Sequence, residues 1–356
     1  MKEFKVYKDW QEFLAEEKTF LRRFRPHRPK KLDVDPEGLA FVESVLACGG
    51  RLSVQAIREA IGSGAWDSIM LDAMHKKLLK GYSSIYAITH WPKLVSNIAN
   101  VSDFKTQYAI QLGDFTSLDK VPAGGPYFET SFTDDRVSYT VAKYGNTFPV
   151  SFEALTNDDL GVLTRVSDRF GRAAARTLET FVLSTLIDAN PTIYDGNNLF
   201  DSTNHGNDLG SSCNLTRANL ETAKTKFRLF TDPDGNKLNI RPKYLIVDPT
   251  KEWVARRLLE SPDDPETANR AINVHKGSLE LIVSGEITTN AWYLVADPAV
   301  VDTIEIGFLG GRREPELWIE DPRSGHAFTY DERRIRARLV FGGVVLDYRG
   351  FVRAGV

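Results

Sequence analysis

The longest helical pattern in the chain covers residues 158–189, and it limits the folds that the other segments can adopt. Thr156 or Asn157 would supply the N-cap, and Pro191 would end the helix. At 1.5 Å per residue such a helix is about 45 Å long, more than the width of a small domain. This spine helix therefore cannot lie inside one globule and must run along the molecule.

The spine helix carries an apolar stripe and a separate cationic face. The stripe that we expect to be buried consists of Leu160, Leu163, Val166, Phe170, Ala174, Leu178 and Phe181. The second face, here called the arginine face, consists of Arg165, Arg169, Arg172 and Arg176. Two interpretations of it remain open: a solvated face that pairs locally with Asp168 and Glu179, or a set of contacts to carboxylates on a neighbouring subunit.

Residues 104–152 alternate between apolar and polar positions, as the strands of a long β-hairpin do. Turn residues in "DKVPAGGPY" separate the outgoing arm from the return arm. An isolated two-stranded hairpin is only marginally stable in water, so this one needs another surface. That surface is either the subunit's own core or a neighbouring subunit, and the aromatic residues that we expect at a contact between subunits are Phe128, Phe132, Tyr139 and Tyr144.

The remaining segments complete an α+β chain. Strand, helix and strand patterns alternate after the spine helix as in an α/β lobe, and the last strands include a half-buried one with Ile335, Ala337, Leu339 and Phe341 on its apolar face. A helix pattern in the second segment stops at Gly81, and extended chain follows it. The predicted segments are a helical part at 1–62, an arm at 63–103, the hairpin at 104–152, the spine-helix domain at 153–214, the α/β lobe at 215–289 and returning strands at 290–356.

The stretch "YDGNNLFDSTNHGND" at 194–208 gathers Asp, Ser and His in a short space. Catalysis by Ser202 and His205 would require the hydroxyl on a sharp elbow of the G-x-S-x-G type, which is absent here. Asn204, His205 and Gly206 are good occupants of turn positions with a positive φ. The pattern favours a structured turn, and no catalytic residue is predicted.

Metal and cofactor signatures are absent from the sequence. The 194–208 stretch lacks the glycine and glutamate of a calcium loop, and neither a P-loop nor a dinucleotide fingerprint occurs. His75 and His90 stand among apolar residues with no second ligand at metal spacing, so we interpret both as structural. We therefore expect no metal and no cofactor.

Composition places the chain among ordinary globular proteins, with 42% hydrophobic and 26% charged residues. Its 356 residues exceed what one core usually holds, so two lobes are expected. A formal charge of -3 argues against binding to nucleic acid through overall positive charge. Cys48 and Cys213 lie far apart, which indicates a reducing compartment, and no apolar run is long enough to span a membrane.

The order of elements, together with three strings, resembles the major capsid proteins of tailed bacteriophages. The strings are "LLKGY" followed by "VSDFK", then "EALTNDDLGVLTRVSDRFGRAAARTLE", then "DGNNLFDSTNHGN". With the C-terminal part they cover the chain from about Trp66 onward. They are most similar to the Mu-like major head subunit group, whose fold is shared with encapsulins and with the floor domain of herpesvirus capsids.

The resemblance implies the tailed-phage major capsid fold: an N-arm, an E-loop at the hairpin, a peripheral domain around the spine helix and an axial domain. It also implies a structural protein, not an enzyme, that assembles into hexamers and pentamers of an icosahedral shell around double-stranded DNA. Its partners would be other copies of itself, portal, scaffold and decoration proteins, and DNA bound without sequence specificity, with no membrane. Made in the host cytoplasm, it would reside in the virion capsid.

Two departures from the family pattern and two alternatives stay open. Met1–Gly62 is far too short for the protease to which some Mu-like members are fused, so we expect a compact scaffold-like segment that is retained. Lys120 or Lys143 could serve in a crosslink like that of some relatives, but no matching local motif is present. The alternative functions are an encapsulin-like compartment shell and a soluble α/β hydrolase using Ser202 and His205.

Overall fold

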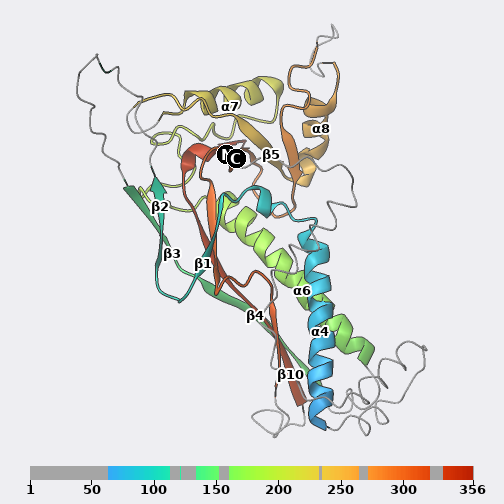
Figure 1. The fold of residues 1–356 in the computed structure, drawn as a ribbon. Coiled ribbons are helices and arrows are strands. Elements are labelled where there is room, and N and C mark those ends of the chain that lie inside the picture. Colours follow the sequence, from blue (N-terminus) through green and yellow to red (C-terminus); the bar gives the residue numbers. More distant parts are fainter. Residues whose placement is uncertain are drawn as a thin grey trace. The chain divides into compact units, whose positions relative to one another are not determined.

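The computed structural model describes residues 63–112, 121, 134–151, 160–231, 235–263, 272–320 and 332–355. It divides into two compact units, Met1–Ile69 and Met70–Val356, and the side-chain contacts of the fold described here all belong to the second. The predicted helical segment at 1–62 lies outside the described residues. The described residues combine helices with three sheets, which confirms the α+β prediction (Figure 1).

Helix α4, Ser63–Tyr86, continues beyond Gly81, where the sequence pattern predicted its end. Gly81 does not terminate the helix, because its missing side chain serves packing: a β-carbon there would meet the backbone oxygen of Asp168. Gly171 has the same role on the partner helix, opposite the backbone of Leu78. The two helices therefore cross at backbone contact.

The spine helix is confirmed over its described length, but it is not α-helical throughout. It consists of α6, Leu160–Thr180, and a π-helical segment η2, Phe181–Asp188. Its buried side is centred on Ser167, Gly171, Ala175 and Leu178, while Val166, Phe170 and Ala174 of the predicted stripe are only half-buried. The predicted stripe therefore lies to one side of the face that is buried. Small residues occupy that face at the close crossing with α4, and a hydropathy pattern does not identify small residues as buried.

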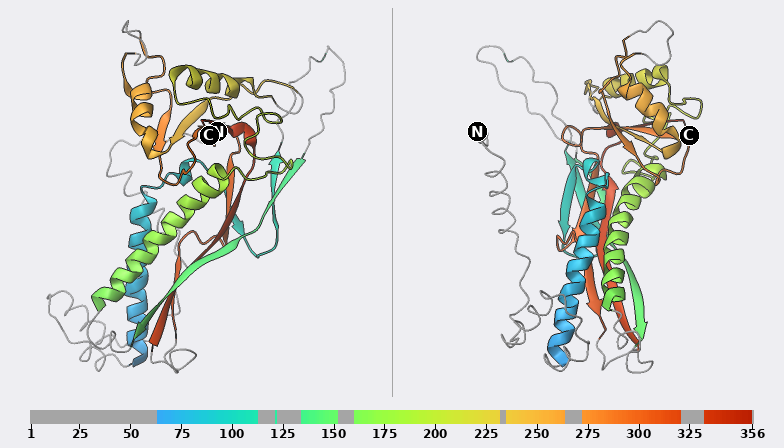
Figure 2. Two further views of the ribbon diagram at one scale, coloured as in Figure 1. Left: turned by 180° about the vertical axis from the view of Figure 1, so that it is seen from behind. Right: turned by 90° about the vertical axis from the view of Figure 1, so that its right-hand side faces the viewer.

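Five strands form the larger sheet, in the order β1–β8–β10–β4, with β9 also paired to β10. Their bounds are Asn97–Val101 for β1, Ile304–Leu309 for β8, Glu332–Val345 for β10, Ala142–Ser151 for β4 and Glu316–Ile319 for β9. Helices α4 and α6 pack on one face of this sheet (Figure 2). Alternate residues of β10 point to that face, so the half-buried strand predicted from Ile335, Ala337, Leu339 and Phe341 is confirmed.

The opposite face of the five-stranded sheet receives the hairpin. Its arms are β2, Gln107–Leu112, and β3, Asp134–Tyr139, which pair antiparallel as predicted. Val137 and Tyr139 of β3 join Val101 and Val340 of the sheet in one apolar cluster. The base of the hairpin therefore rests on its own subunit. Residues 142–151, which we expected in the hairpin's return arm, instead pair with β10.

Four strands form the second sheet, in the order β11–β7–β5–β6. Their bounds are Phe351–Ala354, Trp292–Ala296, Pro242–Val247 and Glu280–Val283. Helices α7, Arg217–Leu229, and α8, Glu252–Glu260, cover one face. The other face, with Tyr244, Tyr293 and Phe351, joins the core beneath the spine helix, so central β7 is buried on both sides.

The strand pairing cuts across one predicted boundary. We expected residues 290–356 to return to the spine-helix domain, and β8 to β10 do so. Strands β7 and β11 pair instead with β5 and with each other in the sheet of the α/β lobe. The other short helical turns are η1 at Trp91–Lys93, η3 at Pro249–Lys251 and η4 at Tyr348–Gly350. The domain limits themselves remain predictions.

Candidate functional site

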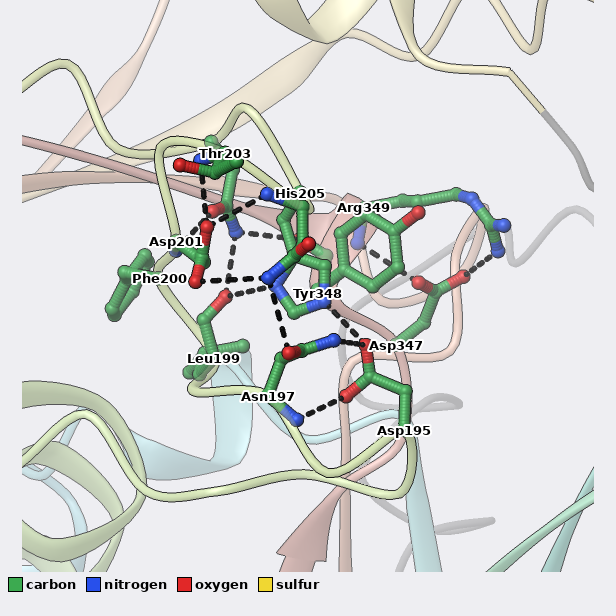
Figure 3. Close-up of polar contacts among 12 residues, drawn as sticks. Asp195, Asn197, Leu199, Phe200, Asp201, Thr203, His205, Asp347, Tyr348 and Arg349 are labelled. Atoms are coloured by element: carbon green, nitrogen blue, oxygen red, sulfur yellow. Dashed lines mark hydrogen bonds and ion pairs between the residues drawn. The ribbon is translucent and has the colours of Figure 1, made fainter.

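The loop that follows the spine helix is a compact, hydrogen-bonded turn (Figure 3). Asn190, at φ 52°, begins it and exchanges hydrogen bonds of 3.1 and 2.7 Å with the backbone of Phe200. The Asp201 carboxylate accepts from the backbone N–H groups of Thr203 and Asn204 at 2.6 and 2.7 Å. Asp and Asn side chains that bond nearby backbone groups form turns of this type. The structured-turn interpretation of 194–208 is thus supported by the contacts.

His205 lies at the centre of this loop and is 8% exposed. Its Nε2 is 2.6 Å from Asp195 Oδ2, and its Nδ1 is 3.2 Å from the carbonyl oxygen of Leu199. The ring also stacks on Tyr348, with centroids 4.0 Å apart (Figure 3). Both ring nitrogens face acceptor oxygens, so neither offers a lone pair to Ser202. The arrangement is that of a structural histidine, unlike the base of a Ser-His-Asp triad.

Asp195 is held as a carboxylate by the same contacts. Burial raises its pKa, but hydrogen bonds from Asn197 and His205 outweigh burial and bring the pKa below the ordinary value of an aspartate. A carboxylate that accepts several hydrogen bonds is stabilised in its charged form. The side chains of Asp195, Asn197 and His205 therefore bind one another.

The loop is hydrogen-bonded to strand β11 of the four-stranded sheet. Arg353 N–H donates to the carbonyl of Asn207 at 2.8 Å, and Leu209 N–H donates to the carbonyl of Arg353 at 2.9 Å. The guanidinium of Arg353 forms a 2.5 Å ion pair with Asp208, and both side chains are nearly buried. These contacts fix the position of the α/β lobe relative to the end of the spine helix.

Asp188, the last residue of η2, makes a second set of contacts between the spine helix and the α/β lobe. Asp188 accepts hydrogen bonds from the backbone and hydroxyl of Thr288 at 2.9 and 2.8 Å and from the Tyr293 hydroxyl at 2.7 Å, and the Thr289 hydroxyl adds another. Burial raises the pKa of Asp188, yet these donors lower it below the ordinary value. One buried carboxylate therefore links the spine helix to the α/β lobe.

Glu179 fastens the spine helix to the segment after α4. Its carboxylate accepts from the backbone N–H groups of His90 at 3.0 Å and Trp91 at 2.9 Å. Burial raises the pKa of Glu179, and those backbone hydrogen bonds counteract it only in part. Glu179 was one of two expected local partners of the arginine face, but its oxygens are directed at orphan N–H groups of a helical turn instead.

The four aromatic residues predicted at a contact between subunits have different surroundings. Phe128 and Phe132 lie outside the described residues. Tyr139 is buried and donates to Glu305 Oε1 at 2.9 Å, and Tyr144 stacks on Phe341 with centroids 4.3 Å apart. Burial, followed by the nearby Glu305, raises the pKa of Tyr139. Tyr139 and Tyr144 thus stabilise their own subunit's sheet.

The arginine face points away from that core. All four arginines are exposed, while Ala175 and Leu178 on the other side of α6 are completely buried. Arg172 pairs with Asp168 at 2.9 Å, as the local interpretation expected. Among the residues that the structure describes, it is the one arginine of the four with an ion-pair partner.

One cavity of about 300 Å³ lies beside β8 and β10. Arg338 pairs with Glu316 at 2.6 Å in its lining, and Arg312 contacts the same carboxylate. The charges there compensate one another. In the described part of the chain, no three His, Cys, Asp or Glu side chains gather as metal ligands would, and none of its helices combines the length and apolarity needed to cross a membrane.

Sequence patterns missed the residues that fasten the domains. Glu179 and Asp188 are the two charged residues in the stretch "TLETFVLSTLID" of the spine helix, whose other residues are apolar or carry a hydroxyl. Burial of a charge is costly unless it is hydrogen-bonded, so acidic residues on the apolar side of a helix are a usable signal of such anchors. The partners themselves come from segments about 90 to 105 residues away, which no local pattern identifies.

Comparison with known proteins gives the family. The family model described as phage capsid protein matches residues 134–354. Among solved structures, the chain is similar to the capsid of the cyanophage P-SCSP1u, at 12% identity and a TM-score of 0.52, over 75% of this chain and 87% of that one. No match was found among curated protein sequences.

Two further structures have lower scores. The chain is similar to a structure of Mycobacterium phage Adephagia at 14% identity and a TM-score of 0.47, over 76% and 83% of the two chains. It is similar to the capsid of bacteriophage JBD30 at 14% identity and a TM-score of 0.43, over 74% and 64%. The family match covers more than half of the chain and implies assembly with copies of itself in the shell of a virion. The chain therefore belongs to the phage capsid protein family and is a structural major capsid protein.

Proposed function

We propose that this capsid protein forms hexamers and pentamers that close into an icosahedral shell around double-stranded DNA. In this proposal the tip of the hairpin and the arginine face of α6 lie at contacts between neighbouring copies. Portal, scaffold and decoration proteins are further proposed partners, and synthesis takes place in the host cytoplasm.

The observation that carries the proposal is the arginine face. Arg165, Arg169 and Arg176 are exposed on the side of α6 that turns away from the subunit's own core. A single exposed ion pair contributes about 1 kcal/mol or less. A shell repeats each contact in every subunit, and closed symmetry turns many weak contacts into a stable assembly. The chain has 48 acidic residues, which offer carboxylate partners on a second copy.

The charge balance fits a container for DNA. A formal charge of -3 on the whole chain gives the wall little attraction for phosphates. Affinity for nucleic acid rises steeply with the number of phosphates that a protein neutralises. A shell wall with almost no net charge would therefore enclose the packaged DNA and bind it only weakly. Weak binding suits a genome that must leave the shell.

The test is a double charge reversal, Arg169→Glu with Arg176→Glu. Both residues are exposed, so the variant should keep the circular dichroism spectrum and the cooperative unfolding of the natural chain. We expect it to lose shells in electron micrographs and large species in sedimentation velocity. The matched double variant Arg169→Lys with Arg176→Lys keeps the charges and should assemble. Shells at normal yield from the glutamate variant would contradict the role of the arginine face.

A further inference from the structure

Helix α7 and the segment before β6 bring together an acid, a histidine and a lysine in hydrogen-bonded sequence. Glu221 Oε1 lies 3.2 Å from His275 Nε2. His275 Nδ1 lies 3.1 Å from Lys224 Nζ, which also donates to Ser278 Oγ at 2.7 Å. None of these residues contributes to the anchors or the arginine face described above.

The contacts assign the proton positions on His275. The carboxylate of Glu221 accepts only, so Nε2 carries the proton and donates to it. The Nδ1 lone pair then faces Lys224 and accepts from its ammonium group. Acid, imidazole and amine thus have the order of orienting group, base and nucleophile that activates weak nucleophiles in enzymes.

The surroundings also raise the fraction of Lys224 whose amine is neutral. The pKa of Lys224 is lowered to about 8: burial is the largest cause, Glu221 acts in the opposite direction, and Arg228 adds to the lowering. His275 is buried, whereas Ser278 on the other side of the amine is exposed. The amine therefore has a base on its protected side and an opening to solvent on the other.

We propose that Lys224 is a modification site at which the amine is acylated by small activated acyl donors of the acyl phosphate class. The ammonium gives its proton to His275 Nδ1, and Glu221 stabilises the imidazolium. The nitrogen lone pair then forms the C–N bond to the acyl carbon, and the C–O bond to phosphate breaks with its electron pair on the departing phosphate. The nitrogen loses its second proton to the departing phosphate, so the product is a neutral N-acyl lysine, and the first proton passes from His275 to solvent.

Three other charged groups lie near Lys224 and His275, and none of the three is hydrogen-bonded to the lysine amine or to the imidazole. Arg217 pairs with Glu221 at 3.0 Å, and Arg228 follows Lys224 by one turn of α7. Lys276 is exposed next to His275 in the sequence. Glu221 is also exposed, and Arg217 and His275 together lower its pKa. It therefore stays ionised at neutral pH and keeps His275 oriented toward Lys224.

The experiment treats the purified full-length chain with acetyl phosphate at pH 7 and maps acetylated peptides by mass spectrometry over time. Lys226, on the same helix, is the internal control, because no described residue is placed against its amine as His275 is against that of Lys224. At pH 7 an amine with a pKa near 8 is about 10% neutral, against about 0.03% for an ordinary lysine. Weaker basicity offsets part of that advantage, and we expect Lys224 to react at least about tenfold faster than Lys226.

Two variants separate activation from mere exposure. His275→Gln should reduce the acetylation rate of Lys224 to about that of Lys226 while the rate of Lys226 stays the same. Glu221→Gln changes an exposed residue and keeps the fold in case the buried histidine variant unfolds, and it should lower the rate of Lys224 severalfold. Equal rates at Lys224 and Lys226 in the natural chain, or a Lys224 rate unaffected by Glu221→Gln, would overturn the proposal.

Discussion

Gly171 lies against the backbone carbonyl of Leu78, so closely that a β-carbon on the glycine would overlap it. The two residues mark the point where α6 crosses α4. Close approach of two helices requires that at least one side chain be absent at the crossing. The position of the spine helix relative to α4 thus depends on a residue with no side chain.

Replacing Gly171 by Ala should destabilise the subunit although alanine is the better helix former. Alanine gains about 1 kcal/mol in helix propensity. Overpacking a tight site costs about 1–3 kcal/mol, and here the obstructing atoms belong to the backbone. We expect a lower midpoint of urea unfolding. The matched control is Gly285→Ala, where a β-carbon would meet nothing within 4 Å. Equal midpoints for the two variants would argue against a tight crossing.

Asp188→Asn should lower the free energy of unfolding by about 2–4 kcal/mol at pH 7, because hydrogen bonds to a buried charged group are the stronger ones. An amide keeps one acceptor oxygen and turns its NH₂ donors toward the donors of Thr288 and Thr289. Chemical denaturation measures the loss. Asp302→Asn changes an exposed aspartate and should have little effect.

The same variant should show a distinct pH dependence. The pKa of Asp188 is lower in the folded chain than in the unfolded one, so the unfolded chain binds more protons between the two values. The ionised Asp188 therefore contributes fully to stability when the pH is above its pKa in the unfolded chain. This contribution is lost as the pH falls through its pKa in the folded chain. The difference between the natural chain and Asp188→Asn should shrink as the pH falls below about 4. A constant difference down to pH 3 would contradict this account.

His205→Ala should reduce stability and leave no catalytic signature. The change removes a buried ring that stacks on Tyr348 and deprives Asp195 of a hydrogen bond, which together cost about 2–4 kcal/mol. Assembly below the unfolding temperature should be nearly intact or modestly weaker. Ser202→Ala, at an exposed position, should change neither property. Ester hydrolysis that both substitutions abolish would instead support the hydrolase alternative.

Removing residues 114–132 with a short Gly-Ser linker should separate folding from assembly. Because Val137 and Tyr139 belong to the subunit's own cluster, the deletion must leave β2 and β3 in place. Loop closure then changes by only about 1 kcal/mol, whereas each contact between copies would lose hundreds of square ångströms.

The shortened chain should be soluble, unfold cooperatively and fail to form shells in electron micrographs. Failure to fold would mean that the removed segment, which includes Phe128 and Phe132, stabilises its own subunit. Complete shells would mean that it makes no essential contact between copies.

Local patterns in the sequence determined the elements that short-range physics controls. The spine helix, the alternation of β10 and the pairing of the hairpin arms follow from periodicity, capping and turn residues, which act over a few positions. The absence of a catalytic elbow around Ser202 was equally readable, because such motifs are contiguous. A turn at 194–208 could be predicted from Gly206, which has a φ of 63°, whereas Asn204 and His205, also expected at a positive φ, do not adopt one.

Tertiary structure alone decided which surfaces those elements bury. Gly81 resembled a helix end until α6 was packed against it, and Tyr139 and Tyr144 resembled residues at a contact between subunits until β10 and β8 lay beside them. The acceptors Glu179 and Asp188 serve donors that are 88 to 105 residues distant. Such contacts depend on the three-dimensional positions of segments that are remote in sequence. The hydropathy and spacing of neighbouring residues therefore cannot predict them.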